Sequence, residues 1–210
     1  MKKLVIIVLL IVLTGCSSAQ FVDSWKNPET ISFNPKKALL VGITDNLTAR
    51  KIFEQDFKNE LELRNINAVE STTVLSESFT SSKKSEEEIN EMIQNISKDG
   101  FDAVVITVVK GVEKQKSYYE NYPRMSYGWS RFGRYYYWYQ DIYFTPKYYE
   151  TYDVYHIETS IYNLNGAENK SLIWVGSFKV VNPQSISVTV KDYVHSIIHQ
   201  LEVERLLIKG

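Results

Sequence analysis

The sequence predicts one layered α/β domain with a mixed sheet and about three helices, plus a long aromatic-rich hairpin or loop insertion. Short apolar runs typical of strands alternate with amphipathic patterns typical of helices, which indicates an α/β layer fold. The chain has 210 residues, of which 44% are hydrophobic and 23% are charged. This length and composition can bury a core and exclude global disorder.

The first 15 residues are typical of a lipoprotein signal peptide. Lys2 and Lys3 precede ten apolar residues at positions 4–13, which as a helix reach only about 15 Å, half of a bilayer core. Leu13-Thr14-Gly15-Cys16 matches the bacterial lipobox, and this resemblance implies cleavage after Gly15 and acylation of Cys16. An ordinary signal peptide followed by an incidental cysteine is the alternative.

The residues around Cys16 also suggest a location. No Asp follows Cys16 and no acidic cluster comes after it, so the sorting rules of bacterial lipoproteins imply the periplasmic face of the outer membrane. The expected partner there is the membrane, through the lipid anchor. Cys16 is the only cysteine, which excludes an internal disulfide framework and a multi-cysteine metal site.

Residues 16–36 are expected to form a lipidated tether, because Pro28 and Pro35 break regular structure. Fully extended, such a segment reaches about 70 Å at most. Trp25 is unusual in a linker, and we expect it to dock on the domain. The domain itself is expected to span residues 37–210, with the insertion at 117–152.

The first half of the domain begins with an apolar run at 37–43, which predicts a buried strand. Spacing of Ile52, Phe53, Phe57 and Leu61 predicts a helix over 48–64, and a second strand is expected at 68–73. Ser85 and Glu88 then form a capping box for a helix that Gly100 ends. The apolar run at 101–109 predicts a central strand covered on both faces.

The second half predicts an antiparallel hairpin and a closing helix. Strands are expected at 154–162 and 172–180, with Asn165-Gly166 in the loop between them. Pro183 and Ser185 or Ser187 are expected to open the last helix, whose apolar stripe continues to Leu207.

This order of elements resembles a group of bacterial envelope domains. The group includes the outer-membrane lipoprotein activators of penicillin-binding proteins, the curli secretion lipoprotein and the N-terminal domain of the Tol translocation protein. In that group a strand like KALLVGITDN leads into a helix like ARKIFEQDFKNELELR, and a strand like GFDAVVITVV, a hairpin and a closing helix follow. The resemblance covers residues 37–208 without the insertion and brings no catalytic residues.

The chain also resembles uncharacterised envelope lipoproteins that have a Trp-x-x-Pro start, here Trp25 to Pro28, and a tyrosine-rich centre. The short tether departs from the long linkers of the penicillin-binding-protein activators.

The insertion at 117–152 concentrates aromatic residues. The whole chain has 4 Trp, 15 Tyr and 9 Phe, and 16 of these 28 fall in this segment. Three interpretations compete. The segment is a recognition surface for an envelope protein or glycan, a belt at the membrane interface, or a hairpin that packs on its own sheet. The candidate partner-binding residues are Tyr127, Trp129, Tyr135, Tyr136, Tyr137, Trp138 and Tyr139.

Nucleic acid is not an expected partner. Single strands could stack on such aromatics, but the formal net charge is -1 and falls to -3 once Lys2 and Lys3 are removed. A dedicated nucleic-acid binder needs a basic footprint, and a location in the envelope argues further against this class.

Three histidines are the candidates for catalytic or metal chemistry. His195 and His199 share one helix face and could bind zinc with Asp192 or Glu202, and His156 could act as a general base. Each is more typical of a structural role, and the sequence contains neither a nucleophile elbow nor a phosphate loop. No catalytic residue, metal or cofactor is therefore assigned.

Together these observations predict a lipid-anchored envelope protein that acts as a non-enzymatic binding or assembly module through an aromatic surface. The alternative is an envelope hydrolase or metal-dependent enzyme that uses His156 or the pair of His195 and His199.

Overall fold

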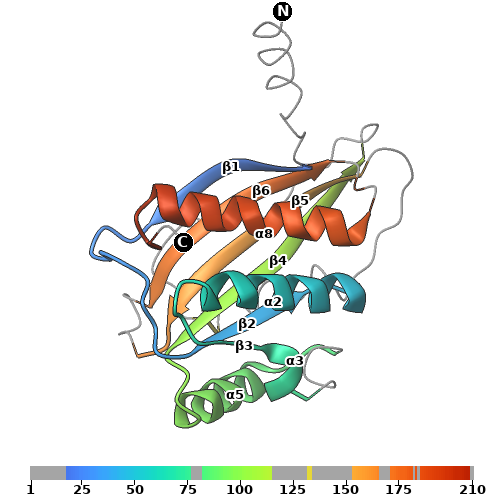
Figure 1. Cartoon of the computed structure of the whole chain (residues 1–210). Helices are drawn as coiled ribbons and strands as arrows, with labels where there is room; N and C mark the ends of the chain where they lie inside the picture. Colours follow the sequence, from blue (N-terminus) through green and yellow to red (C-terminus); the bar gives the residue numbers. More distant parts are fainter. Residues whose placement is uncertain are drawn as a thin grey trace, which may run out of the picture.

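The computed structural model describes residues 18–76, 82–114, 132–133, 153–165, 171–181, 183 and 185–208. These residues form a six-stranded mixed sheet with strand order β1-β6-β5-β4-β2-β3 (Figure 1), and the predicted fold class is confirmed. The strands are β1 (Ala19–Lys26), β2 (Ala38–Ile43), β3 (Ala68–Glu70), β4 (Ala103–Lys114), β5 (Asp153–Asn163) and β6 (Leu172–Val181).

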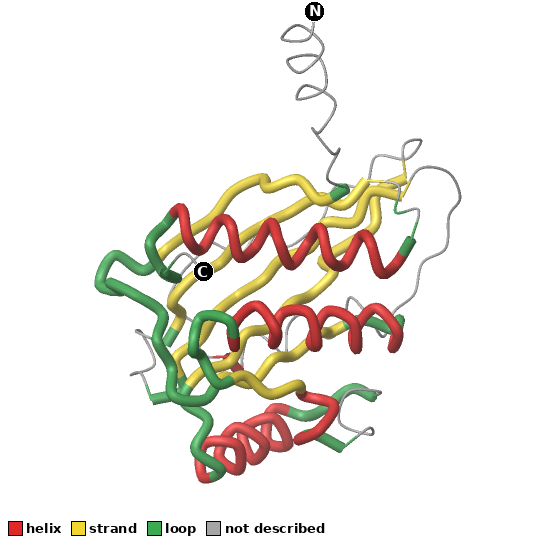
Figure 2. Tube along the Cα trace, in the orientation of Figure 1, coloured by secondary structure: helices red, strands yellow, loops and turns green. Residues whose placement is uncertain are grey.

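The described helices are three long ones, as expected, and one short one. They are α2 (Leu47–Glu62), α3 (Ser71–Val74), α5 (Glu86–Lys98) and α8 (Ile186–Val203); Figure 2 separates them from the strands. The short helix α3 occupies positions that we expected to belong to the second strand. The strand stops at Glu70 because the side chain of Ser71 turns into a buried hydrogen-bond network.

The sheet combines parallel and antiparallel pairs. Strand β2 is parallel to both β3 and β4, whereas β4, β5, β6 and β1 follow one another as antiparallel neighbours. The predicted hairpin of β5 and β6 is therefore confirmed. Strand β4 runs five residues beyond the predicted end at Val109, and a bulge lies between Val109 and Gly111.

The prediction of a tether over 16–36 is wrong for residues 19–26. These residues form β1, which pairs with β6 from Ala19 opposite Val180 to Lys26 opposite Trp174. Ala19 is buried, and the ring of Phe21 meets that of Phe178 edge-on with centroids 5.7 Å apart. This packing and the hydrogen bonds to β6 hold the segment as a strand. Its polar residues are the reason that the sequence alone did not predict this strand.

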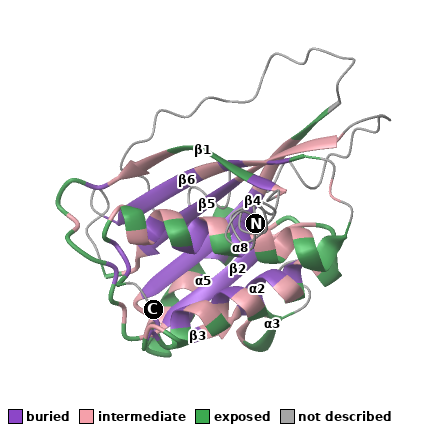
Figure 3. Cartoon of the chain, turned by 45° about the horizontal axis from the view of Figure 1, so that its top comes forward, coloured by how far each residue is buried: buried purple, intermediate pink, exposed green. Residues whose placement is uncertain are grey.

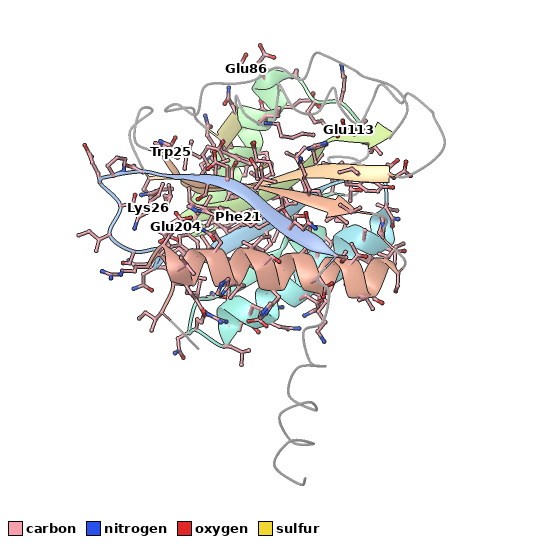
Figure 4. All side chains as sticks on the ribbon, turned by 90° about the horizontal axis from the view of Figure 1, so that it is seen from above. Phe21, Trp25, Lys26, Glu86, Glu113 and Glu204 are labelled. Atoms are coloured by element: carbon pink, nitrogen blue, oxygen red, sulfur yellow. The ribbon has the colours of Figure 1, made fainter. Side chains whose placement is uncertain are left out.

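Trp25 docks on the domain as predicted, because it packs against the core on one face of the sheet. On the opposite face the Lys26 ammonium donates to the backbone carbonyl of Glu204, 2.9 Å away. Figure 4 shows Lys26 and Glu204 close together at the far end of β1. The Glu204 carboxylate also accepts from the Trp174 indole at 3.0 Å, so β1, β6 and the end of α8 are joined at one place.

Each face of the sheet has its own core. Helices α2 and α8 lie side by side over one face, where Phe57 and Ile197 pack among Trp174 and Phe178. Helix α5 covers the opposite face, where Ile89 and other apolar residues meet β2 and β4. Figure 3 shows the buried strands between these two layers, which confirms that the central strand is covered on both faces.

Helix ends follow the sequence closely. The side chain of Ser85 accepts from Glu88 N–H while the Glu88 carboxylate accepts from Ser85 N–H, which confirms the capping box. Gly100 has a φ of +85°, the left-handed conformation in which glycine ends a helix. The closing helix is shorter than expected. It ends at Val203, and Leu206 folds back so that its N–H donates to the Leu201 carbonyl at 2.8 Å.

Candidate functional site

Both ends of the aromatic insertion leave the sheet at one place. Lys114 at the end of β4 pairs with Asp153 at the start of β5, so the segment at 115–152 begins and ends on adjacent strands. Val154 in turn pairs with Val181, the last residue of β6. The two residues that border the insertion, Lys114 and Asp153, therefore lie at the end of the sheet where β4 and β6 finish (Figure 1).

The start of β1 lies at this same end of the sheet. Val181 N–H donates to the Ser18 carbonyl at 3.3 Å. The backbone N–H and the hydroxyl of Ser18 both donate to Asp192 Oδ2 of α8, each at 3.0 Å. Cys16 is only two residues away, so its Cα lies within about 8 Å of the Ser18 Cα whatever path the chain takes.

Tyr155 follows Val154 on β5 and pairs with Val180 at the same end of the sheet, where it is half-buried. Burial, with the charges of Asp153 and Asp45 nearby, raises the pKa of its phenol above the usual value. The phenol is therefore neutral at physiological pH and can donate a hydrogen bond.

Two residues from the middle of the insertion are described, and both pack on the domain. Phe132 is 2% exposed, and its ring meets that of Tyr162 edge-on with centroids 5.7 Å apart. A Cβ placed on Gly133 would lie 3.0 Å from the Ile93 side chain, so the backbone passes close over α5. At these two positions the chain packs on the sheet face that α5 covers, as the self-packing interpretation expects.

The seven aromatic residues proposed to bind a partner lie outside the described residues, and so does Cys16. Neither the recognition nor the membrane interpretation of those aromatics is tested by the part of the chain that the structure describes. They remain predictions about the segment that joins Lys114 to Asp153.

A row of polar side chains follows β4 and β5 on the face that Phe132 contacts. Glu158 is 2% exposed and its carboxylate lies 2.8 Å from the Lys110 ammonium. His156 Nε2 lies 3.1 Å from Glu113 Oε2. The Ser160 hydroxyl is buried and has no hydrogen-bond partner in the part of the chain that the structure describes.

The carboxylate beside His156 is not the one that the sequence suggests. Two-residue spacing places His156 and Glu158 on one face, but Glu158 forms its ion pair with Lys110, and the carboxylate beside His156 is Glu113. Sequence reasoning missed the buried pair, because only the register of β4 against β5 reveals that Lys110 and Glu158 are neighbours.

His195 and His199 point into solvent from α8. Among the described residues, no group of three His, Cys, Asp or Glu side chains is arranged to hold a metal ion. The zinc alternative for this pair thus has no third ligand from the described parts of the fold.

A second buried polar cluster lies where β2 ends. The Glu54 carboxylate accepts from Gly42 N–H at 3.0 Å, from Arg50 Nε at 2.9 Å and from the Ser71 hydroxyl at 2.5 Å. Arg50, Glu54 and Ser71 are all buried. The cluster joins α2, β2 and α3, and its carboxylate is fully occupied by hydrogen bonds. The signal in the sequence was a charged i,i+4 pair on the same helix face as Phe53 and Phe57.

None of the helices in the described ranges is both long enough and apolar enough to cross a membrane.

The chain matches no protein-family model and no curated protein sequence. It is similar to several solved structures. The PelC dodecamer from Paraburkholderia phytofirmans aligns with a TM-score of 0.44 and 10% identity, over 85% of this chain and 94% of that one. Lipoprotein GNA1162 from Neisseria meningitidis aligns with a TM-score of 0.41 and 12% identity, over 80% of this chain and 99% of that one.

A DUF4136 family protein from Bacteroides thetaiotaomicron aligns with a TM-score of 0.36 and 9% identity, over 90% of this chain and 99% of that one. Similarities of this size assign neither a family nor an activity, because unrelated functions share folds.

Proposed function

We propose that this chain is a bacterial lipoprotein, acylated at Cys16 and held at the periplasmic face of the outer membrane. The support comes from the signal sequence, the lipobox and the residues after it. Several acyl chains on one cysteine suffice for stable anchoring, because each buried CH₂ contributes about 0.8 kcal/mol. Loss of the protein from the membrane fraction in a Cys16→Ser variant would test this part of the proposal.

On that anchor, the chain acts as a non-enzymatic binding or assembly module, and the aromatic segment at 117–152 is its contact surface. One observation carries this proposal. Lys114 and Asp153 fix both ends of the segment at the same end of the sheet as Ser18, two residues from the anchor. Tyr and Trp supply large contact areas at low entropic cost, and their faces also stack on sugar rings. The partner is an envelope protein or a glycan.

The buried acidic side chains support a structural rather than a catalytic role. Glu54 is saturated by hydrogen bonds, and Glu158 is paired with Lys110 at 2.8 Å. A carboxylate held in this way is already occupied by groups of the fold itself, so it is poorly placed to exchange a proton with a substrate.

Photo-crosslinking in cells tests the contact surface. A photoreactive amino acid is placed at Tyr127 or Trp138, and the matched control position is Leu63, which is 72% exposed at the other end of the domain. We expect one discrete adduct from Tyr127 or Trp138 and not from Leu63, and mass spectrometry then identifies it as protein or glycan. No adduct from either aromatic position, or identical adducts from Leu63, would contradict the proposed surface.

A further inference from the structure

Exposed apolar side chains lie beside the point where the chain enters the fold. Val181, whose N–H bonds to the Ser18 carbonyl, is exposed, and so are Ile186 and Val188 in the first turn of α8. Exposed apolar groups in water are unfavourable in proportion to their area. Contact between these side chains and a nearby apolar or interfacial layer would therefore be favourable.

The contact between Ser18 and Asp192 fixes the distances involved. Ile186 precedes Asp192 by six residues, which is about 9 Å along a helix axis. Ser18 is bonded to the Asp192 carboxylate at 3.0 Å, and Cys16 lies within about 8 Å of Ser18. The lipid attachment site and the first turn of α8 are thus held within reach of one membrane surface.

The membrane is favoured over other occupants because so little chain separates the fold from the lipid. The headgroup region of a bilayer adds only about 5–7 Å to each side of its hydrocarbon core, and Cys16 lies within about 8 Å of Ser18, so the membrane surface is the layer that the anchor brings nearest to the first turn of α8. The first turn of α8 contains no acidic residue, so anionic headgroups would not repel it.

We infer that the first turn of α8, with Ile186, Val188 and the adjoining Val181, rests in the headgroup layer of the membrane that holds the acyl chains of Cys16. This inference rests on the proposed acylation. It adds that the domain has one fixed orientation, with this end of the sheet against lipid and the end that carries Glu204 pointing away.

Site-specific fluorescence tests the orientation in the full acylated protein. The protein is reconstituted in vesicles of phosphatidylethanolamine and phosphatidylglycerol that carry a lipid with a spin label on its headgroup. Acylated Cys16 leaves no native thiol to label, so Val188→Cys can be coupled alone to an environment-sensitive dye. The matched control is Val203→Cys, because both valines lie on α8 with similar exposure, 59% and 57%, and Val203 adjoins Glu204 at the far end.

We expect a blue-shifted emission and several-fold stronger quenching by the spin-labelled lipid at position 188 than at position 203. Equal quenching at both positions, or none at either, would overturn the inference. A blue shift at position 188 without quenching by lipid would also overturn it, because a protein would then cover the patch.

The mass of the N-terminal peptide separates this failure from failure of the anchor. An unmodified Cys16 would remove both proposals. An acylated Cys16, in protein that floats with the vesicles but shows no quenching at position 188, would remove the orientation alone.

Discussion

Truncation of Phe132 to alanine tests whether the aromatic insertion is fastened to the sheet. The ring is 2% exposed and packs edge-on against Tyr162 at 5.7 Å. Removal of a buried phenylalanine side chain typically costs 3–5 kcal/mol. We expect a loss of about 3 kcal/mol in the free energy that holds the insertion in place, which corresponds to about a hundredfold in an equilibrium constant.

Phe21→Ala is the matched control. Its ring also meets a buried aromatic ring edge-on at 5.7 Å, but it is 43% exposed. Because water already covers much of this ring, we expect its truncation to cost less than about 1 kcal/mol.

Two measurements together cover both ways in which the insertion can respond. Urea unfolding reports a loss of global stability, and limited proteolysis within 117–152 reports local opening. If the insertion detaches before the sheet unfolds, the rate of cleavage should rise by about a hundredfold while the urea midpoint moves little. If neither the urea midpoint nor the cleavage rate changes in Phe132→Ala, then the packing of Phe132 does not hold the insertion and the reasoning is refuted.

Three further predictions follow from buried and exposed polar groups. Glu54→Gln leaves the Arg50 charge buried without its carboxylate, so urea unfolding should show a loss of about 3–5 kcal/mol; a loss below about 1 kcal/mol would contradict the buried pair. Burial raises the pKa of the Tyr193 phenol in the folded protein. The raised pKa stabilises the fold fully at pH values below the unfolded pKa of about 10, and this stabilisation is lost progressively as the pH rises above that value. Tyr193→Phe should therefore cost about 1 kcal/mol at neutral pH through its lost hydrogen bond, and this difference should shrink in unfolding curves above about pH 10. Replacement of His195 and His199 together by alanine should leave the zinc content of the purified protein unchanged, and a loss of stoichiometric zinc would support the metal-enzyme alternative.

The sequence was most informative where one local pattern decides one element. The capping box of Ser85 and Glu88 and the glycine at position 100 placed both ends of α5, because they act through bonds within a few residues. It was least informative for β1. The bulge near Val22 breaks the alternation of apolar and polar residues, and the packing partners of this strand come from β6 and α8, about 150 to 180 residues later.

The same difference between local and long-range contacts explains how much of the candidate site could be predicted from the sequence. A pair at i,i+4 such as Arg50 and Glu54 is visible in the sequence, but its burial follows from the three-dimensional position of α2 against the end of β2. Lys110 and Glu158 are 48 residues apart, and only the β4–β5 register, with its bulge after Val109, brings them together. Contacts of this kind depend on register, which a single sequence does not fix.

The position of β1 limits which partners the aromatic segment can reach. A free tether over 16–36 would allow a reach of about 70 Å, but Ala19 is already paired with β6 and Ser18 is bound to Asp192. With lipid on Cys16, the free chain spans about 8 Å, and the height of the domain is set by strands such as the eight residues of β1, about 26 Å in length. If Cys16 is acylated as proposed, a partner that contacts the insertion beside Lys114 and Asp153 is therefore expected close to the same membrane. The proposed short anchor differs from the long linkers of activators that act across the periplasm. Under the proposed location, outer-membrane proteins and glycans close to that membrane are the first partners to test.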